Sequence, residues 1–183
     1  MNPYSMALKN KSGIWGMQLG LLLLAAGCSQ STPDASRSIV TRDRVVDESP
    51  RMSASERSER FEYAFGKGME WVERGEYGIA IGAFEEAVRM NPDSIEAQFN
   101  LGACHEQVGD PVKAIQIYRQ ILRRLPNDPA CYANLGTSYI KMYHLERSPI
   151  WRKMAIDAWE RSLALDPEQP RVRKFLAMAD TAD

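Results

Sequence analysis

In the C-terminal two thirds of the chain, apolar residues recur at the spacing of amphipathic helices, and each periodic segment closes at a proline. The closing residues are Pro92, Pro126 and Pro167. A proline stops a helix because it lacks the backbone N–H donor and its ring clashes with the preceding turn. Pro92 and Pro126 lie 34 residues apart (126 − 92). The pattern therefore predicts an all-α domain built from a repeated unit.

Small and bulky residues recur in phase with these prolines. Gly68, Gly102 and Gly136 fall in the first helix of successive units, where a missing side chain lets the second helix approach closely. Gly75 and Gly109 follow the first helices and suit turns that need a positive φ angle. The residues expected to fill the space between helices are Trp71, Phe84, Tyr118, Tyr139 and Trp159.

The recurring Asn100-Leu101-Gly102 and Asn134-Leu135-Gly136 segments, with their closing prolines, resemble the tetratricopeptide repeat (TPR) over residues 61–167. The resemblance implies an all-α, TPR-type solenoid of helical hairpins, with about three repeats and a C-terminal capping helix. The physical reason for stacking is general. A two-helix unit cannot bury its apolar face alone, so units stack and the last unit needs a cover.

These observations divide the chain into six predicted segments. Ser53 and Glu56 form a capping box at the start of a long first helix, and Pro170 begins the capping helix. The segments are a cleaved signal peptide (1–27), a lipidated cysteine with a flexible tether (28–52), TPR 1 (53–94), TPR 2 (95–128), TPR 3 with lengthened helices (129–168), and the capping helix with a tail (169–183). The apolar stripe of the capping helix is Val172, Phe175, Leu176 and Ala179.

The third unit is longer than the others, because Pro126 and Pro167 lie 41 residues apart (167 − 126). The seven extra residues are close to two helical turns, so each helix of the pair can gain about one turn. Ser148 and Pro149 then suit the N-cap and first position of the second helix. The extension spans residues 143–154. Its apolar groups either pack between the two lengthened helices or contact a partner.

The N-terminus has the features of an export signal. Lys9 and Lys11 precede an apolar run that leads to Cys28. The run is about 13 residues long, and a membrane-spanning helix needs roughly 20. Translation from Met1 or from Met6 would leave a workable signal.

The segment Leu24-Ala25-Ala26-Gly27-Cys28 resembles the lipobox of bacterial lipoproteins, although Ala25 stands where leucine is usual. The resemblance implies cleavage before Cys28 and lipidation of its thiol. An ordinary secretory signal and an uncleaved anchor are the alternatives. Ser29, by analogy with such lipoproteins, implies the outer membrane facing the periplasm. Residues 29–52 are rich in Ser, Asp, Arg and Pro, and this composition predicts a disordered tether.

Composition excludes several other functions. The net charge of −1 offers no large basic surface, so nucleic acid is not an expected partner. Three cysteines and two histidines are too few and too scattered for a disulfide framework, a zinc site or a haem attachment site. No nucleophile–base pair is recognisable. We therefore expect no metal, no cofactor, no small-molecule substrate and no enzymatic activity.

By resemblance, the first helices of the repeats line a concave groove that holds an extended peptide or a partner helix. Asn100 and Asn134 are the residues placed to hydrogen-bond a peptide backbone, because an amide both donates and accepts. The other expected groove residues are Phe65, Met69, Phe99, Ala103, Gln107, Thr137, Ile140 and Lys141. Ala130 and Ala133 stand where TPR domains that bind acidic C-terminal tails carry basic residues, so such a tail is not the expected ligand.

Three further residues are interpreted as structural. Cys104 and Cys131 occupy positions where alanine is usual, which indicates small buried side chains. Their offset of about 10 Å along parallel helices exceeds the roughly 7 Å Cα limit for a disulfide. His105 lies on the face where a core aromatic residue is expected.

The sequence thus predicts a membrane-anchored TPR interaction scaffold of the bacterial cell envelope, whose partners are other proteins. By analogy, it would assist assembly of a pilus, a secretion channel or an outer-membrane complex. The alternative is a docking or regulatory subunit of an envelope enzyme such as a cell-wall hydrolase.

Overall fold

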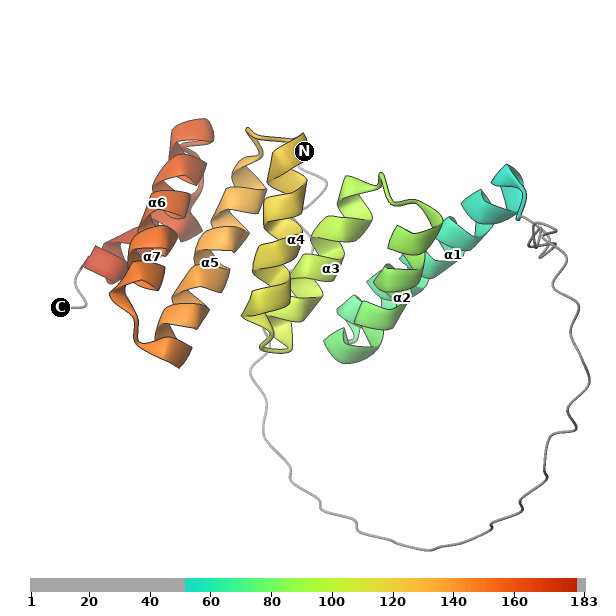
Figure 1. Ribbon diagram of the computed structural model, residues 1–183, viewed down its shortest axis with the longest axis horizontal. Coiled ribbons are helices and arrows are strands. Elements are labelled where there is room, and N and C mark those ends of the chain that lie inside the picture. Colours follow the sequence, from blue (N-terminus) through green and yellow to red (C-terminus); the bar gives the residue numbers. More distant parts are fainter. Residues whose placement is uncertain (1–51, 181–183) are drawn as a thin grey trace, which may run out of the picture. The chain divides into compact units, whose positions relative to one another are not determined.

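The computed structural model describes residues 52–180, which form seven α-helices and no strand (Figure 1). The signal peptide, Cys28 and the rest of the tether before residue 52 lie outside the described residues. The helices are α1 (Ala54–Glu73), α2 (Tyr77–Met90), α3 (Ile95–Gln107), α4 (Pro111–Arg124), α5 (Pro129–Glu146), α6 (Pro149–Leu165) and α7 (Pro170–Asp180).

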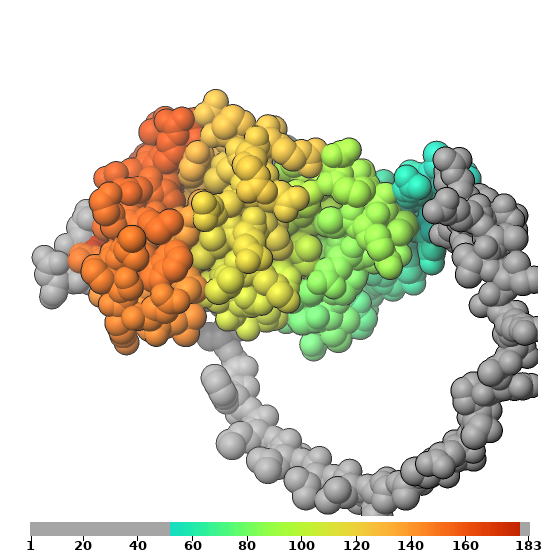
Figure 2. All heavy atoms as spheres, viewed as in Figure 1, coloured from blue at the N-terminus to red at the C-terminus, as the bar shows by residue number. Residues whose placement is uncertain are grey.

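The helices pair in chain order into hairpins, and each helix packs against the next (Figure 1). The first helices of the second and third hairpins, α3 and α5, also contact each other. On the face shown in Figure 2, side chains fill the spaces between neighbouring ribbons. The expected all-α stack of helical hairpins is confirmed.

Each hairpin closes by placing an aromatic ring of its second helix on a glycine of its first. A Cβ added to Gly68 would lie 2.6 Å from the Phe84 ring, and one added to Gly136 would lie 2.5 Å from the Trp159 ring. Tyr118 is 3.0 Å from the corresponding point on Gly102. Phe84, Tyr118 and Trp159 are all buried. The three glycines are therefore needed for close helix packing, as the sequence predicts.

The helix ends follow the local sequence. The Ser53 hydroxyl accepts from the backbone N–H of Glu56, and the Glu56 carboxylate accepts from the backbone N–H of Ser53, so the predicted capping box is confirmed. The Asp128 carboxylate accepts from the Cys131 N–H at 2.7 Å and caps α5. Gly75 and Gly109 have φ angles of 78° and 84°, which confirms their role in the turns.

The third hairpin is lengthened as expected. Helices α5 and α6 have 18 and 17 residues, against 13 and 14 in α3 and α4. Ser148 is the N-cap residue of α6, and Pro149 is its first helical residue. The Trp151 ring stacks on Tyr139 at 5.8 Å, and its Nε1–H donates to the Glu146 carboxylate. The added turns thus pack on each other, while Leu145 and Ile150 at the tip are 68% and 60% exposed.

Helix α7 covers the C-terminal hairpin. Val172 and Ala179 are buried, and the Phe175 ring lies 5.6 Å from the Trp159 ring. The Arg152 guanidinium on α6 donates to the carbonyl of Ala179, 3.0 Å from Nε. The apolar stripe predicted for the capping helix is therefore the face that packs on α6.

The ring-on-glycine contacts predict opposite effects for two glycine substitutions. Gly136→Ala lowers the free energy of unfolding by about 1–3 kcal/mol, because the new methyl group overlaps the Trp159 ring. Gly82→Ala is the matched control in α2, where nothing lies within 4 Å of the new Cβ, and it raises the same quantity by about 0.5–1 kcal/mol. Urea denaturation measures both. Equal effects of the two substitutions would contradict the packing described.

Candidate protein-binding surface

The groove residues expected from the sequence all lie on α1, α3 and α5, the first helices of the three hairpins. We call the surface that these helices and α7 present the first-helix surface. The structure divides the expected residues into three groups. Some line pockets, some form internal hydrogen bonds or ion pairs, and some pack in the core.

A small pocket lies where α3 meets the turn between α1 and α2. It is lined by Val72, Tyr77, Asn100, Ala103, Cys104 and Gln107. Its volume of about 10 Å³ is close to that of a single water site, so it does not admit a side chain as it stands. Three of the expected groove residues, Asn100, Ala103 and Gln107, are brought together here, and Gln107 is exposed.

The two asparagines expected to bind a peptide backbone have internal hydrogen bonds. The Asn100 side-chain amide donates to the Glu96 carbonyl at 3.0 Å within α3, and the residue is 8% exposed. The Asn134 amide donates to the Tyr118 hydroxyl at 3.3 Å and is half-buried. Each bond uses an amide N–H of the asparagine. That the amide oxygens of Asn100 and Asn134 bind a peptide stays a prediction.

The aromatic members of the expected groove serve the core. Phe99 is 4% exposed, and its ring packs edge-on against Tyr118 at 5.6 Å. Its assignment to the groove is therefore corrected. Adjacent residues on a helix point about 100° apart, so Phe99 turns inward toward Tyr118 of α4 while the next residue, Asn100, lines the small pocket. Phe65 and Met69 are half-buried against the cluster around Phe84.

Lys141 joins α5 to α3 across the first-helix surface. Its ammonium donates to the backbone carbonyl of Glu106 at 2.6 Å and lies 3.3 Å from the Glu106 carboxylate. Glu106 is 6% exposed. Burial raises the pKa of Glu106, and the positive charges of Lys141 and Arg171 oppose that shift. Lys141 therefore stabilises the charged form of the Glu106 carboxylate at a buried position, where desolvation disfavours that form.

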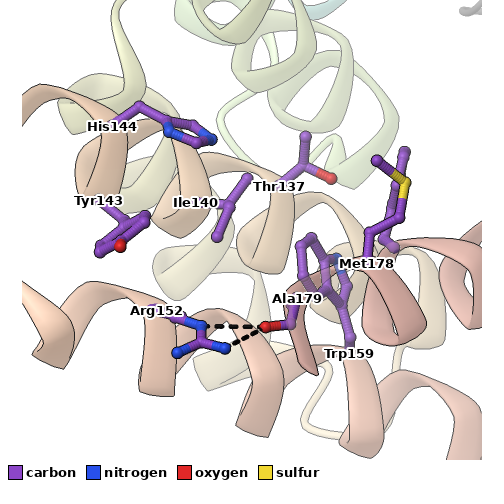
Figure 3. A pocket seen from close by; sticks show the side chains of 9 residues that line it. Thr137, Ile140, Tyr143, His144, Arg152, Trp159, Met178 and Ala179 are labelled. Carbon is purple, nitrogen blue, oxygen red and sulfur yellow. Dashed lines mark hydrogen bonds between the residues drawn. The ribbon is translucent and has the colours of Figure 1, made fainter. Parts of the chain in front are cut away.

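Thr137 and Ile140, the remaining expected residues, line a much larger pocket between α5, α6 and α7, which we call the C-terminal pocket (Figure 3). Its volume is about 300 Å³, within the range of ligand-binding pockets. The lining residues are Thr137, Ile140, Tyr143, His144, Arg152, Trp159, Phe175, Met178 and Ala179.

Three of the polar side chains on the wall of the C-terminal pocket bond within the protein. The Thr137 hydroxyl and the Trp159 Nε1–H both donate to the Ala133 carbonyl, each at 3.1 Å. The Arg152 guanidinium points to the Ala179 carbonyl (Figure 3). The pocket therefore offers a ligand mainly apolar surface.

Sequence reasoning found only two of the nine residues that line this pocket, Thr137 and Ile140. Tyr143, His144 and Arg152 belong to the extension of the third unit, residues 143–154, which the sequence predicts. Phe175 was placed on the packing stripe of the capping helix. The sequence pattern thus indicates both the extension and the capping helix. It does not give the distance between α5 and α7, on which the pocket depends.

Residues with reactive side chains have structural positions. Cys104 and Cys131 are buried free thiols, and burial raises the pKa of Cys104 to about 12 and that of Cys131 further. His105 is 4% exposed, as expected for a core residue. Within residues 52–180, no group of three or more potential metal ligands occurs, and none of the helices has the length and apolar character to span a membrane.

Comparison with known proteins agrees with this geometry. The family model of the tetratricopeptide repeat matches residues 65–129. Among curated proteins, the photosystem I assembly protein Ycf3 of Synechococcus sp. (strain CC9605) is 28% identical over 103 residues, or 51% of this chain. The match covers 60% of the length of that relative.

Solved structures show the same fold. The TPR domain of Arabidopsis OM64 superposes with a TM-score of 0.62 at 16% identity, covering 69% of this chain and 99% of that domain. The first TPR domain of Spaghetti (RPAP3), bound to the HSP90 peptide SRMEEVD, gives 0.60 at 17% identity, with 68% and 94% covered. At these identities the likeness concerns the fold alone. The chain folds as an all-α, TPR-type solenoid.

The link between Lys141 and Glu106 predicts a strong coupling. Lys141→Met lowers the free energy of unfolding by about 1–3 kcal/mol, because the buried Glu106 carboxylate loses its ammonium partner. Adding Glu106→Leu recovers most of that loss, since no buried charge remains. Urea denaturation of the single and double variants at neutral pH gives the coupling energy. Strictly additive effects would show that the two side chains do not interact.

His105 predicts a pH dependence of stability. Burial, and secondarily the charge of Lys113, lowers the pKa of His105 from 6.5, while Asp110 and Glu85 oppose the shift. The folded chain therefore binds fewer protons than the unfolded chain as the pH falls through 6.5. The free energy of unfolding decreases as the pH is lowered from about 7.5 to 6. His105→Gln lacks this component, and parallel curves for the two proteins would refute the assignment.

Proposed function

We propose that this chain is a protein-binding scaffold of the bacterial cell envelope, held on a membrane by lipid on Cys28. Its first-helix surface holds a segment of a partner protein, an extended peptide or a helix. The scaffold assists assembly of a multiprotein envelope complex, such as a pilus, a secretion channel or an outer-membrane complex.

The observation that carries the binding part is the C-terminal pocket on the first-helix surface. It is about 300 Å³ in volume, mainly apolar, and built on helices rather than loops. A preformed apolar pocket binds with little conformational cost, because its walls are already ordered. Nothing about the pocket calls for a reacting group, and TPR domains generally act as non-catalytic interaction scaffolds.

The comparisons support both halves of the binding proposal. The RPAP3 domain is described with a peptide of HSP90 bound to it, so this fold can hold a short segment of another protein. The Ycf3 proteins are described as assembly proteins of photosystem I. For this chain the proposal includes only the general roles, peptide binding and complex assembly, and not the particular partners of those proteins.

The sequence before residue 52 supports the anchoring part. Leu24 to Cys28 resembles a lipobox and follows a basic and apolar signal region. Two acyl chains are enough for stable membrane attachment, since each buried methylene contributes about 0.8 kcal/mol. A tether of about 25 residues would then keep the domain near the membrane at a raised local concentration of membrane partners.

Site-specific photocrosslinking in cells tests the binding surface. A photoreactive amino acid at Gln107, exposed on α3, should give a crosslinked adduct with a partner protein. The same amino acid at Gln116, exposed on α4, is the matched control and should give none, because α4 is a second helix. Adducts at Gln116 alone would reject the first-helix surface as the binding site.

Metabolic labelling with radioactive palmitate tests the anchor. The full chain should become labelled and remain with the membrane fraction in high salt. Cys28→Ser should abolish both the label and the membrane attachment, because the thiol is the acylation site. A chain that stays unlabelled, or a Cys28→Ser variant that stays labelled, would remove the lipoprotein assignment without affecting the binding proposal.

A further inference from the structure

Part of the wall of the C-terminal pocket comes from the lengthened third hairpin. Tyr143, His144 and Arg152 are the lining residues that belong to the extension, residues 143–154. The opposite wall is α7, which packs mainly on α6 and leaves open space toward α5. Figure 3 shows these side chains around the space between the helices. The extension therefore supplies three of the nine residues that line the pocket.

The size and lining of the pocket define what fits. Ile140, Trp159, Phe175 and Met178 present apolar surface on three sides. A space of about 300 Å³ holds one large side chain such as tryptophan, phenylalanine or leucine. A charged or amide group placed against this apolar surface would lose hydration, and the wall atoms of Thr137 and Trp159 already bond within the protein.

Positive charge borders the pocket on the α7 side. The Arg171 guanidinium lies over the Phe175 ring, 5.2 Å from its centroid, and Phe175 lines the pocket. Lys174 precedes Met178 by four residues, so the two side chains are neighbours on one face of α7. Both Arg171 and Lys174 are exposed.

The Glu106 carboxylate, which is buried, neutralises only part of the positive charge of the basic groups that act on it. Glu106 is already bonded to Lys141, and Arg171 acts on it as a second positive charge. One buried acid therefore faces two basic groups. An acidic residue on the ligand complements the excess positive charge.

We propose that the C-terminal pocket binds a single large apolar side chain, aromatic or leucine, of an internal partner segment that carries an acidic residue beside it. The apolar side chain enters between α5 and α7, and the acidic residue pairs with Arg171 or Lys174. This inference rests on the proposed scaffold function and gives it a ligand chemistry.

Binding of three blocked tripeptides to the full chain tests the ligand chemistry. The probes are acetyl-Glu-Trp-Glu-amide, acetyl-Glu-Ala-Glu-amide and acetyl-Lys-Trp-Lys-amide. NMR signals of the Trp159 indole N–H and the Met178 methyl group report on occupancy, because both residues line the pocket. The acidic tryptophan peptide should bind at least tenfold more tightly than the alanine peptide. It should also bind severalfold more tightly than the lysine peptide, with the difference shrinking in high salt.

Matched variants locate the site. Met178→Glu should weaken binding of the acidic tryptophan peptide at least tenfold, because it places a carboxylate at the pocket. Leu145→Glu makes the same change at a side chain that is 68% exposed and outside the pocket lining, and should leave binding unchanged. Ile140→Trp fills the pocket from within and should abolish binding. Lys174→Glu should remove the preference for acidic over basic peptides. Circular dichroism checks that each variant is folded.

The outcomes separate this inference from the proposed function. Equal binding of the tryptophan and alanine peptides, or unchanged binding to Met178→Glu, would overturn the pocket assignment. Equal binding of the acidic and basic tryptophan peptides would overturn the charge requirement. If Met178→Glu keeps the crosslinked adduct at Gln107 in cells, the scaffold function stands and this inference fails. If no adduct forms at Gln107 in the unaltered chain either, the proposed function itself fails.

Discussion

The close approach of two helices at a glycine is the constraint on which the rest of this structure depends. Phe84, Tyr118 and Trp159 each lie on a glycine of the preceding helix, and a methyl group would overlap the rings at Gly68 and Gly136 and be tightly packed at Gly102. Each ring is thereby buried inside its hairpin, and neighbouring hairpins supply the remaining apolar cover. All three contacts join the second helix of a hairpin to its first helix.

The arrangement also fixes the position of the first-helix surface. The first-helix surface is held by helices, by the Lys141–Glu106 pair between α3 and α5, and by the Arg152 contact with the end of α7. The apolar C-terminal pocket, about 300 Å³ in volume, is the part of this surface on which the binding proposal rests. The lengthened third hairpin adds Tyr143, His144 and Arg152 to the wall of this pocket and keeps the contact of an aromatic ring with a glycine, Trp159 on Gly136.

Much of this fold could be predicted from residues whose roles are local. The closing prolines, the glycines under rings, the Ser53–Glu56 box and the Ser148-Pro149 start of α6 act within one or two helices. Less of the binding surface could be predicted from the sequence. Phe99 and Asn100 are adjacent, and helical spacing alone did not show that Phe99 packs on Tyr118. The pocket depends on how far α7 stands from α5, a tertiary distance that no periodicity contains.

Native-state hydrogen exchange on the full chain tests the central claim, that the hairpins are stable only as a stack. Gly102→Ala perturbs the ring contact inside the second hairpin, at Tyr118. If the hairpins depend on one another, backbone amides in α5 and α6 should lose exchange protection together with those in α3 and α4. Loss of protection confined to α3 and α4, with α5 and α6 exchanging as before, would contradict the account.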